Sequence, residues 1–417
     1  MNNKFRNNFI MAGSLIALAL GLITGIVFKQ AGVAQTWVDG FDLIGKLWVN
    51  ALIILVIPLV LSYLVYTILS MIHARTLGKI GAYALLVHTL ILLAGVVYSL
   101  VFSFTSLELL HDLLPTLSVP VAVDQKAVVA ENPALLQRGL NILNAMLSMI
   151  GKLVLLLMLA AVAWATVVAR YYRVFARRLL AFSQWLSEKA MAWLGNYLLS
   201  LPFAVFALAL PMAATTGFSA IGVAGYYVLL CVCLIIGFLL LFYILVYLKG
   251  SVSVGHFARA MLPPQVVAVT TRSSLASLPA LMETAEHQMQ VPKPVTAVII
   301  PFFVSLFRCN RVVTSPFNVL FLLYVYRLPL DVTTLAIFVL AQIVLSFGTP
   351  GIPSGGRYIN LPLYLAAGVP LEGYILIKAV DAIPDIFKTV LNVTEVMTVT
   401  TIVVSHVKES PALMLKQ

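Results

Sequence analysis

The segment AVDAIPDIFKTVLNV, near the C-terminus, places charged residues inside an otherwise apolar stretch. On an α-helix, Asp381, Asp385, Lys388 and Asn392 fall within about 60° of one another, and Glu395 follows at the edge of the same stripe. Ionisable side chains in a membrane helix are costly, and they face the interior of a helix bundle or a cavity. Two carboxylates against one ammonium leave a negative charge for a cationic group to balance. The stripe therefore indicates a buried polar site, and a self-neutralising structural pair of Asp385 with Lys388 is the alternative.

The composition of the chain defines the surroundings of this stripe. Of the 417 residues, 62% are hydrophobic and only 10% are charged, whereas a soluble protein of this length carries about a quarter charged residues. The segment from Ala190 to Leu248 contains no Asp, Glu, Lys or Arg. A single membrane helix needs about 20 apolar residues, so this segment holds two spans. The chain is therefore predicted to be a polytopic helical membrane protein, with the apolar segment at 9–28 as its first span rather than a signal peptide.

The net charge of +11 comes from basic residues that lie mostly between the apolar segments. They do not cluster as in a nucleic-acid binder, and by the positive-inside rule they mark the cytoplasmic loops. We therefore expect the N-terminus, with Lys4 and Arg6, to be cytoplasmic in the cell (inner or plasma) membrane. Cys231 and Cys233 point to different faces of one apolar helix, so we interpret them as packing residues rather than metal ligands or a disulfide framework.

The C-terminal third differs from the first 250 residues because two of its apolar segments are interrupted. One interruption is TTRSSLASLP, from Thr270 to Pro279, and the other is GTPGIPSGG, from Gly348 to Gly356. Backbone without helical hydrogen bonds cannot face lipid, so it must be buried in protein or line a wet cavity. A pair of such interrupted segments points to the midplane binding site of a transporter. Two ordinary kinked helices are the alternative.

Three motifs, taken in their order and spacing, resemble the dicarboxylate/amino acid:cation symporters, the glutamate transporter homologues. TRSSLASLP is similar to the tip of the first hairpin of that family, GTPGIPSGG to the tip of the second, and VDAIPDIFKTVLNV to the substrate-binding eighth span. The resemblance covers nearly the whole chain. It implies an all-α, elevator-type fold with eight transmembrane spans and two re-entrant helical hairpins.

The resemblance also implies two parts. Residues 1–250 would hold six spans, of which the first, second, fourth and fifth form a scaffold and a homotrimer, while the third and sixth join the transport core at 251–408. The expected spans and hairpins, in chain order, are 9–28, 44–71, 80–104, 140–170, 190–213, 222–248, hairpin one at 255–292, span seven at 295–325, hairpin two at 333–371 and span eight at 373–404.

Roles for individual residues follow from the same resemblance. Asp385 would receive the amino group of the substrate, and Lys388 stands where an arginine binds a side-chain carboxylate. The other expected substrate-binding residues are Arg272, Ser273 and Ser274 in hairpin one, Gly351, Ile352, Pro353, Ser354 and Gly355 in hairpin two, and Thr389 and Asn392 in span eight.

The chain departs from the family where sodium is bound. The seventh span of the family carries N-M-D-G-T, but 307–311 here reads Phe-Arg-Cys-Asn-Arg, and the hydroxyl pair of the third span is Ile-Leu at 91–92. The sodium-binding aspartate of the eighth span is Val396. Apolar side chains supply no oxygen ligands, and a guanidinium repels a cation. A slip of this alignment, with Asn310 or Glu395 restoring part of a site, is the alternative.

The sequence therefore predicts a secondary active symporter for a small carboxylate. An acidic amino acid is the leading substrate, because Asp385 suits an amino group and Lys388 a second carboxylate, and a C4-dicarboxylate is the second candidate. Proton coupling is favoured over sodium coupling. The candidate carriers are Asp381, Glu395 and His88, in a charge network that also contains Arg308; a structural role is the alternative for His88.

The sequence also bears on functions other than active transport. A non-transporting, receptor-like member of the family, or a passive channel, is the main alternative, and the glycines of GTPGIPSGG favour a moving hairpin over a sensor. No nucleophile–base pair is evident in the sequence, so we do not expect an enzyme. No cofactor or metal is expected, and bound sodium is disfavoured.

Overall fold

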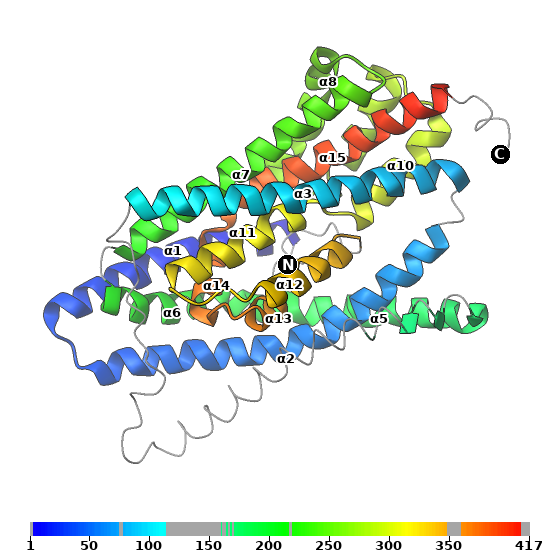
Figure 1. Cartoon of the computed structure of the whole chain (residues 1–417). Helices are drawn as coiled ribbons and strands as arrows, with labels where there is room; N and C mark the ends of the chain where they lie inside the picture. Colours follow the sequence, from blue (N-terminus) through cyan, green and yellow to red (C-terminus); the bar gives the residue numbers. More distant parts are fainter. Residues whose placement is uncertain are drawn as a thin grey trace.

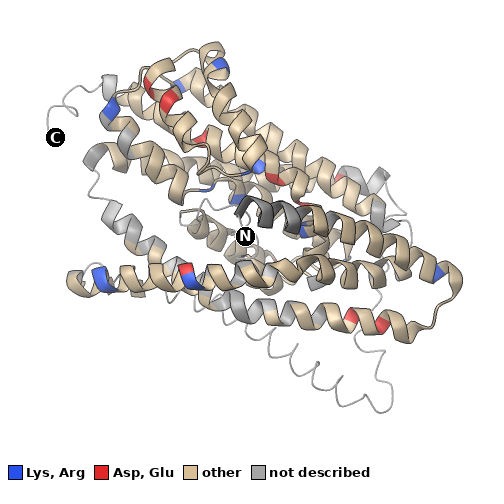
Figure 2. Ribbon diagram, turned by 180° about the vertical axis from the view of Figure 1, so that it is seen from behind, with Lys and Arg blue, Asp and Glu red and all other residues tan. Residues whose placement is uncertain are grey.

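The computed structural model is built of helices (Figure 1), and it describes residues 3–74, 78–113, 160, 164–165, 167–168, 171–216, 219–347 and 360–409. Four of its helices are long and apolar enough to cross a membrane. The membrane-length segments are Ala12–Ala31, Ile80–Glu108, Gly222–Lys249 and Ala382–His406. Charged residues are sparse along the described helices (Figure 2), as the composition requires.

One group of helices comes from the first half of the chain. Helix α1 packs along α6, and α2 packs against both α5 and α6. The bounds of these helices are α1 Asn3–Ala31, α2 Gln35–Ala74, α5 Arg173–Tyr197 and α6 Leu201–Thr216. The expected span at 190–213 thus covers the end of α5, a short 3₁₀ turn and most of α6. The expected span at 140–170 lies almost entirely outside the described residues.

The contact between α1 and α6 depends on a glycine. A Cβ atom added at Gly25 would lie 2.3 Å from the carbonyl oxygen of Leu210 and 2.8 Å from the Cβ of Ala213. Real side chains do not approach backbone so closely, so the two helices can meet at this distance only with glycine at this position.

A second group of helices surrounds α15 (Ala382–Glu409). Helix α15 packs against α3 (Gly78–Leu113), α7 (Ser219–Lys249), α8 (Val254–Thr271) and α10 (Lys293–Leu306). In an apolar 18-residue stretch of its membrane-length part, 89% of the residues are buried. The corresponding share in the other three candidate spans is 28–39%. The charged helix is therefore the enclosed one, and its polar side chains face protein.

The structure describes one of the two expected interruptions. Helix α8 ends at Thr271 and α9 (Leu278–Glu283) begins after a turn, so TTRSSLASLP does break the first hairpin. A π-helical turn at Thr284–Gln288 follows α9. The second hairpin contains α12 (Val332–Ser346) and α13 (Leu361–Ala366), and the tip between them, 348–359, lies outside the described residues.

Two segments that we expected to be continuous are divided. Span seven consists of α10 and α11 (Asn310–Val325), which are separated by an extended Phe307 with φ −103° and ψ 143°. Span eight consists of α14 (Leu371–Val380) and α15, which meet at Asp381. Pro384 has no N–H to donate to the carbonyl four residues earlier, which accounts for the end of α14 at Val380.

Candidate functional site

Asp381, at the junction of α14 and α15, lies among cationic groups. It is 2% exposed, and its Oδ1 atom accepts a short hydrogen bond from the ammonium of Lys388. The ammonium of Lys378 lies 3.6 Å from Oδ2, and the hydroxyl of Tyr227 donates to Oδ1 over 3.4 Å. One carboxylate thus contacts two buried ammonium groups, and these three charges together leave one net positive charge.

The partner of Lys388 differs from the pair suggested by the sequence. Lys388 reaches back two helical turns to contact Asp381, seven residues earlier in the chain. Asp385 is only partly buried, and its carbonyl oxygen accepts a hydrogen bond of 2.8 Å from the hydroxyl of Thr389. Asp381 is thus a close carboxylate partner of Lys388, and Asp385 also interacts with the lysine electrostatically.

The break between α10 and α11 directs three consecutive main-chain N–H groups at other helices. The N–H of Arg308 donates to the carbonyl oxygen of Ser346 over 2.9 Å, at the end of α12. The N–H of Cys309 donates to Oε2 of Glu395 over 3.2 Å, and the N–H of Asn310 donates to Oδ1 of Asn392 over 3.1 Å. The first N–H groups of a helix have no partner within it, so these bonds satisfy the start of α11 and join it to α15.

Two buried arginines flank this break. The guanidinium of Arg308 donates to the carbonyl oxygens of Phe307 and Val304 over 3.1 and 2.9 Å. It thereby places a positive charge at the C-terminal end of α10, where a helix favours cations. Arg311, on α11, is also buried and donates to Oδ1 of Asn360 at the start of α13.

His88 and Glu395 form a buried pair between α3 and α15. His88 Nδ1 lies 2.5 Å from Glu395 Oε1, and the two side chains are 0% and 1% exposed. The imidazole stacks on the ring of Phe307 at 4.5 Å and meets the rings of Phe303 and Phe347 edge to face. The sequence named both residues as candidate proton carriers, and the structure brings them into contact.

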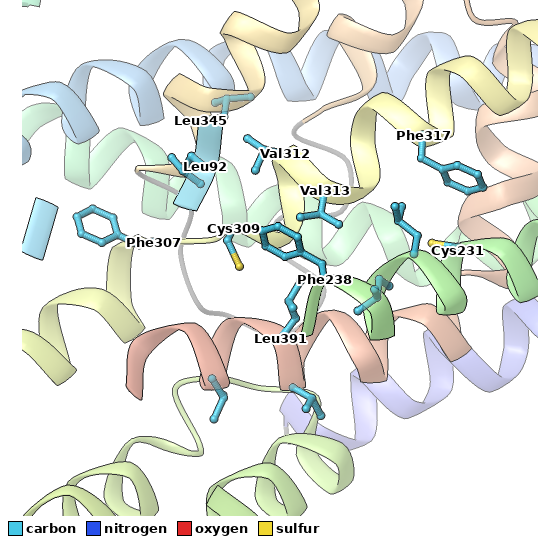
Figure 3. Close-up of a cluster of buried hydrophobic side chains, with 14 of the residues drawn as sticks. Leu92, Cys231, Phe238, Phe307, Cys309, Val312, Val313, Phe317, Leu345 and Leu391 are labelled. Atoms are coloured by element: carbon cyan, nitrogen blue, oxygen red, sulfur yellow. The ribbon is translucent and has the colours of Figure 1, made fainter. Parts of the chain in front are cut away.

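Cys309 and Leu92 stand at positions that the resemblance assigns to sodium binding, and both side chains are buried. Figure 3 shows Cys309 among apolar side chains that include Leu92, Phe238, Val312 and Val313. The described residues contain no group of three or more His, Cys, Asp or Glu side chains that could hold a metal ion.

The turn of the first hairpin is held by its own serine and threonine side chains. Arg272 has φ 51° in the left-handed region and ends α8. The N–H of Ser273 donates to the hydroxyl oxygen of Thr271 over 3.2 Å, and the hydroxyl oxygen of Ser273 accepts from the N–H of Ala276 over 3.3 Å. Ser273 and the neighbouring Ser274 are buried.

The expected site residues are thus described to different degrees. Asp381 with Lys388 and His88 with Glu395 are in direct contact, whereas the expected residues at 351–355 lie outside the described part of the chain. Sequence reasoning did not single out Lys378 or Arg311. Both are charged residues inside apolar segments. The reasoning that selected the stripe on α15 would therefore also have selected them.

These observations define a polytopic helical membrane protein with ionisable groups enclosed in its helix bundle. The chain belongs to the Sodium:dicarboxylate symporter family, whose model matches residues 10–406. It is 25% identical over 390 residues to the "Proton/sodium-glutamate symport protein" of Geobacillus stearothermophilus, covering 91% of this chain and 90% of the relative.

Two further relatives place the chain within that family. The "Proton/glutamate-aspartate symporter" of Escherichia coli (strain K12) is 25% identical over 395 residues, covering 91% of this chain and 88% of the relative. The "Excitatory amino acid transporter 3" of Mus musculus is 28% identical over 138 residues, covering 33% of this chain and 26% of the relative. The protein is therefore a multi-pass secondary symporter related to glutamate and aspartate symporters, and its family is one of transporters rather than enzymes.

Proposed function

We propose that the protein is a homotrimeric, elevator-type symporter that carries an acidic amino acid across the cell (inner or plasma) membrane, with its N-terminus in the cytoplasm. Eight spans and two re-entrant hairpins would form the subunit, and the part at 251–408 would move with its substrate against the first, second, fourth and fifth spans. The coupling ion is the proton rather than sodium.

The balance of buried charge supports this proposal. The buried charged side chains include four basic residues, Arg308, Arg311, Lys378 and Lys388, against two acidic residues, Asp381 and Glu395. Removing such charges from water is costly unless they are compensated. An acidic amino acid carries two carboxylates and one ammonium, so its net negative charge offsets the positive excess of these side chains.

Substrate recognition would use the stripe on α15. Asp385 is the carboxylate for the amino group, and it is only partly buried, so a ligand can approach it. Lys388 would exchange its contact with Asp381 for the distal carboxylate of the substrate. The roles of Arg272, Ser273, Ser274, Thr389, Asn392 and the residues at 351–355 as further ligand contacts rest on the resemblance of the motifs.

Uptake by purified protein in proteoliposomes tests the proposal. L-aspartate, L-glutamate and succinate are offered under an inward proton gradient, with choline or sodium as the external cation. We expect accumulation of an acidic amino acid that does not require sodium. Preferred uptake of succinate would assign a C4-dicarboxylate instead, and binding of L-aspartate without uptake would indicate a receptor-like protein. A saturable rise of tenfold or more in affinity with sodium, at fixed ionic strength, would contradict the proposed coupling.

Two variants test the substrate contacts. Lys388→Ala should shift preference from acidic toward neutral amino acids, because the cation for the second carboxylate is lost. Asp385→Asn should weaken binding of amino acids most. The exposed residues Lys189 and Asp39 provide matched controls, Lys189→Ala and Asp39→Asn, which should leave the substrate panel unchanged. An unchanged panel in Lys388→Ala and Asp385→Asn would show that the site assignment is wrong.

A further inference from the structure

The sequence left three candidate proton carriers, Asp381, Glu395 and His88, and their surroundings in the structure differ. Asp381 contacts two buried ammonium groups, which compensate its charge. Glu395 contacts an imidazole and one main-chain N–H in their place. The two carboxylates on the same helix face therefore have opposite electrostatic surroundings.

The contact between His88 and Glu395 joins an acid and a base at close range. Nδ1 of His88 and Oε1 of Glu395 are 2.5 Å apart, so the two side chains are in direct hydrogen-bond contact. The two residues are 307 positions apart in the chain, so the contact is created by the packing of α3 on α15. A proton shared in this bond belongs to the pair rather than to either residue.

Most of the groups around the His88–Glu395 pair are aromatic. From α10 and α12 the residues in contact with the imidazole are phenylalanines: Phe303, Phe307 and Phe347. From the break before α11 the thiol of Cys309 lies next to Glu395, and the guanidinium of Arg308 interacts in turn with Cys309. His88 Nε2 is fully buried and has no hydrogen-bond partner among the described residues.

The charge of the pair depends on the number of protons that it holds. With one proton, as neutral imidazole and carboxylate, it carries one net negative charge, and with two protons it is neutral. A net charge on a buried pair is unfavourable where its lost hydration is only partly replaced. Imidazole is also the side chain that ordinarily exchanges its proton near neutral pH. The number of protons on the pair therefore decides whether it is charged or neutral inside the bundle.

We propose that His88 and Glu395 together are the proton-binding site of the symporter. The pair takes one proton from water on the side where substrate binds, crosses in its neutral form, and releases that proton to water on the other side. This assignment rests on the proposed function, because it names the residues that carry out proton coupling.

Proton uptake on substrate binding provides a direct test. Purified full-length protein in weakly buffered detergent solution with a pH indicator dye is mixed with L-aspartate near pH 7. The native protein should take up about one proton per bound substrate. Glu395→Gln has the same shape but cannot ionise, and His88→Asn keeps an N–H near the position of Nδ1. Both variants should bind L-aspartate with at least a fivefold smaller proton uptake.

Matched controls separate this effect from a general loss of charge. Glu283→Gln replaces an exposed carboxylate on α9, and His406→Asn replaces a histidine that stacks on Tyr83 at the other end of α15. Both should behave as the native protein. In proteoliposomes, Glu395→Gln should still exchange external for internal L-aspartate within about threefold of the native rate, while accumulation driven by the proton gradient falls at least tenfold.

The possible outcomes distinguish this assignment from the proposed function. If the native protein accumulates L-aspartate with the proton gradient and both variants do the same, the pair is not the proton site, although the protein remains a proton symporter. If the native protein neither takes up protons nor responds to the gradient, proton coupling itself is wrong. Each variant is judged by size-exclusion profile first, and either one that folds is sufficient to decide.

Discussion

Replacement of Asp381 by asparagine should destabilise the protein severely. The change removes the carboxylate that contacts both Lys378 and Lys388, which are 8% and 5% exposed. Loss of one partner of a buried ion pair costs about 3–5 kcal/mol, because the other charge stays buried and uncompensated. We do not expect twice this amount for two lysines, since the Lys378 contact is longer, at 3.6 Å, and an unpaired lysine can release its proton.

Most of this loss of stability should come from the contact between Asp381 and Lys388. In a double-mutant cycle with Asp381→Asn and Lys388→Met, we expect a coupling energy of about 2 kcal/mol, within the range for residues in direct contact. A parallel cycle with Asp385→Asn and Lys388→Met should give a clearly smaller value. The two cycles compare the Asp381–Lys388 contact of the structure with the Asp385–Lys388 pair, which helical spacing also allows.

The measurement is the free energy of unfolding of the purified protein in mixed micelles, titrated with SDS and followed by far-UV circular dichroism. Asp39→Asn, at an exposed aspartate that accepts a hydrogen bond from Gln35, is the control and should change the free energy by less than about 1 kcal/mol. If Asp381→Asn costs no more than this control, or if Asp385 couples to Lys388 more strongly than Asp381 does, the reasoning is refuted.

Three further substitutions follow from the described contacts. Gly25→Ala should destabilise the packing of α1 on α6 by about 1–3 kcal/mol. Gly225→Ala, where an added Cβ meets nothing within 4 Å, is the control and should be neutral. Equal free energies of unfolding in SDS for the two variants would contradict this. Arg308→Met leaves two buried carbonyl oxygens at the end of α10 without their donor and should cost about 2 kcal/mol or more in the same titration, and a loss within error would show that the guanidinium is not needed there. Hydrogen bonds from the hydroxyl and amide of Thr334 hold the pKa of Asp331 below its usual value. The cap of α12 should therefore persist at neutral pH and loosen as the pH falls through that lowered pKa. Deuterium exchange in the first turn of α12, corrected for intrinsic rates, should rise at acid pH, and in Asp331→Ala it should be raised already at pH 7.

Long uncharged apolar runs were the most informative part of the sequence. The uncharged segment Ala190–Leu248 covers α7 up to its last residue, and residues 80–107, which also lack charge, lie within α3. Such segments can satisfy their backbone in lipid only as helices. The turn that follows Thr271 was also predictable, since serines and a proline at 273–279 favour local side-chain hydrogen bonds over a continuing helix.

The break in span seven could not be predicted from local chemistry. Neither glycine nor proline occupies 307–309, while Pro301 and Pro316 lie inside α10 and α11 without dividing them. The break is stabilised by partners from α12 and α15 that are distant in the sequence. In the same way, helical spacing placed Asp381, Asp385 and Lys388 on one face but could not choose the partner of the lysine, which depends on the path of a flexible side chain.

The three N–H groups at 308–310 also bear on which substitutions this family can accumulate. Their bonds to Ser346, Glu395 and Asn392 come from the main chain, so any residue except proline can make them from the α11 side. The geometry of the break can therefore survive while the side chains on it change completely. A lineage could exchange one set of ion-binding side chains for another here without rebuilding the helices, and the chemistry of coupling can diverge faster than the architecture that surrounds it.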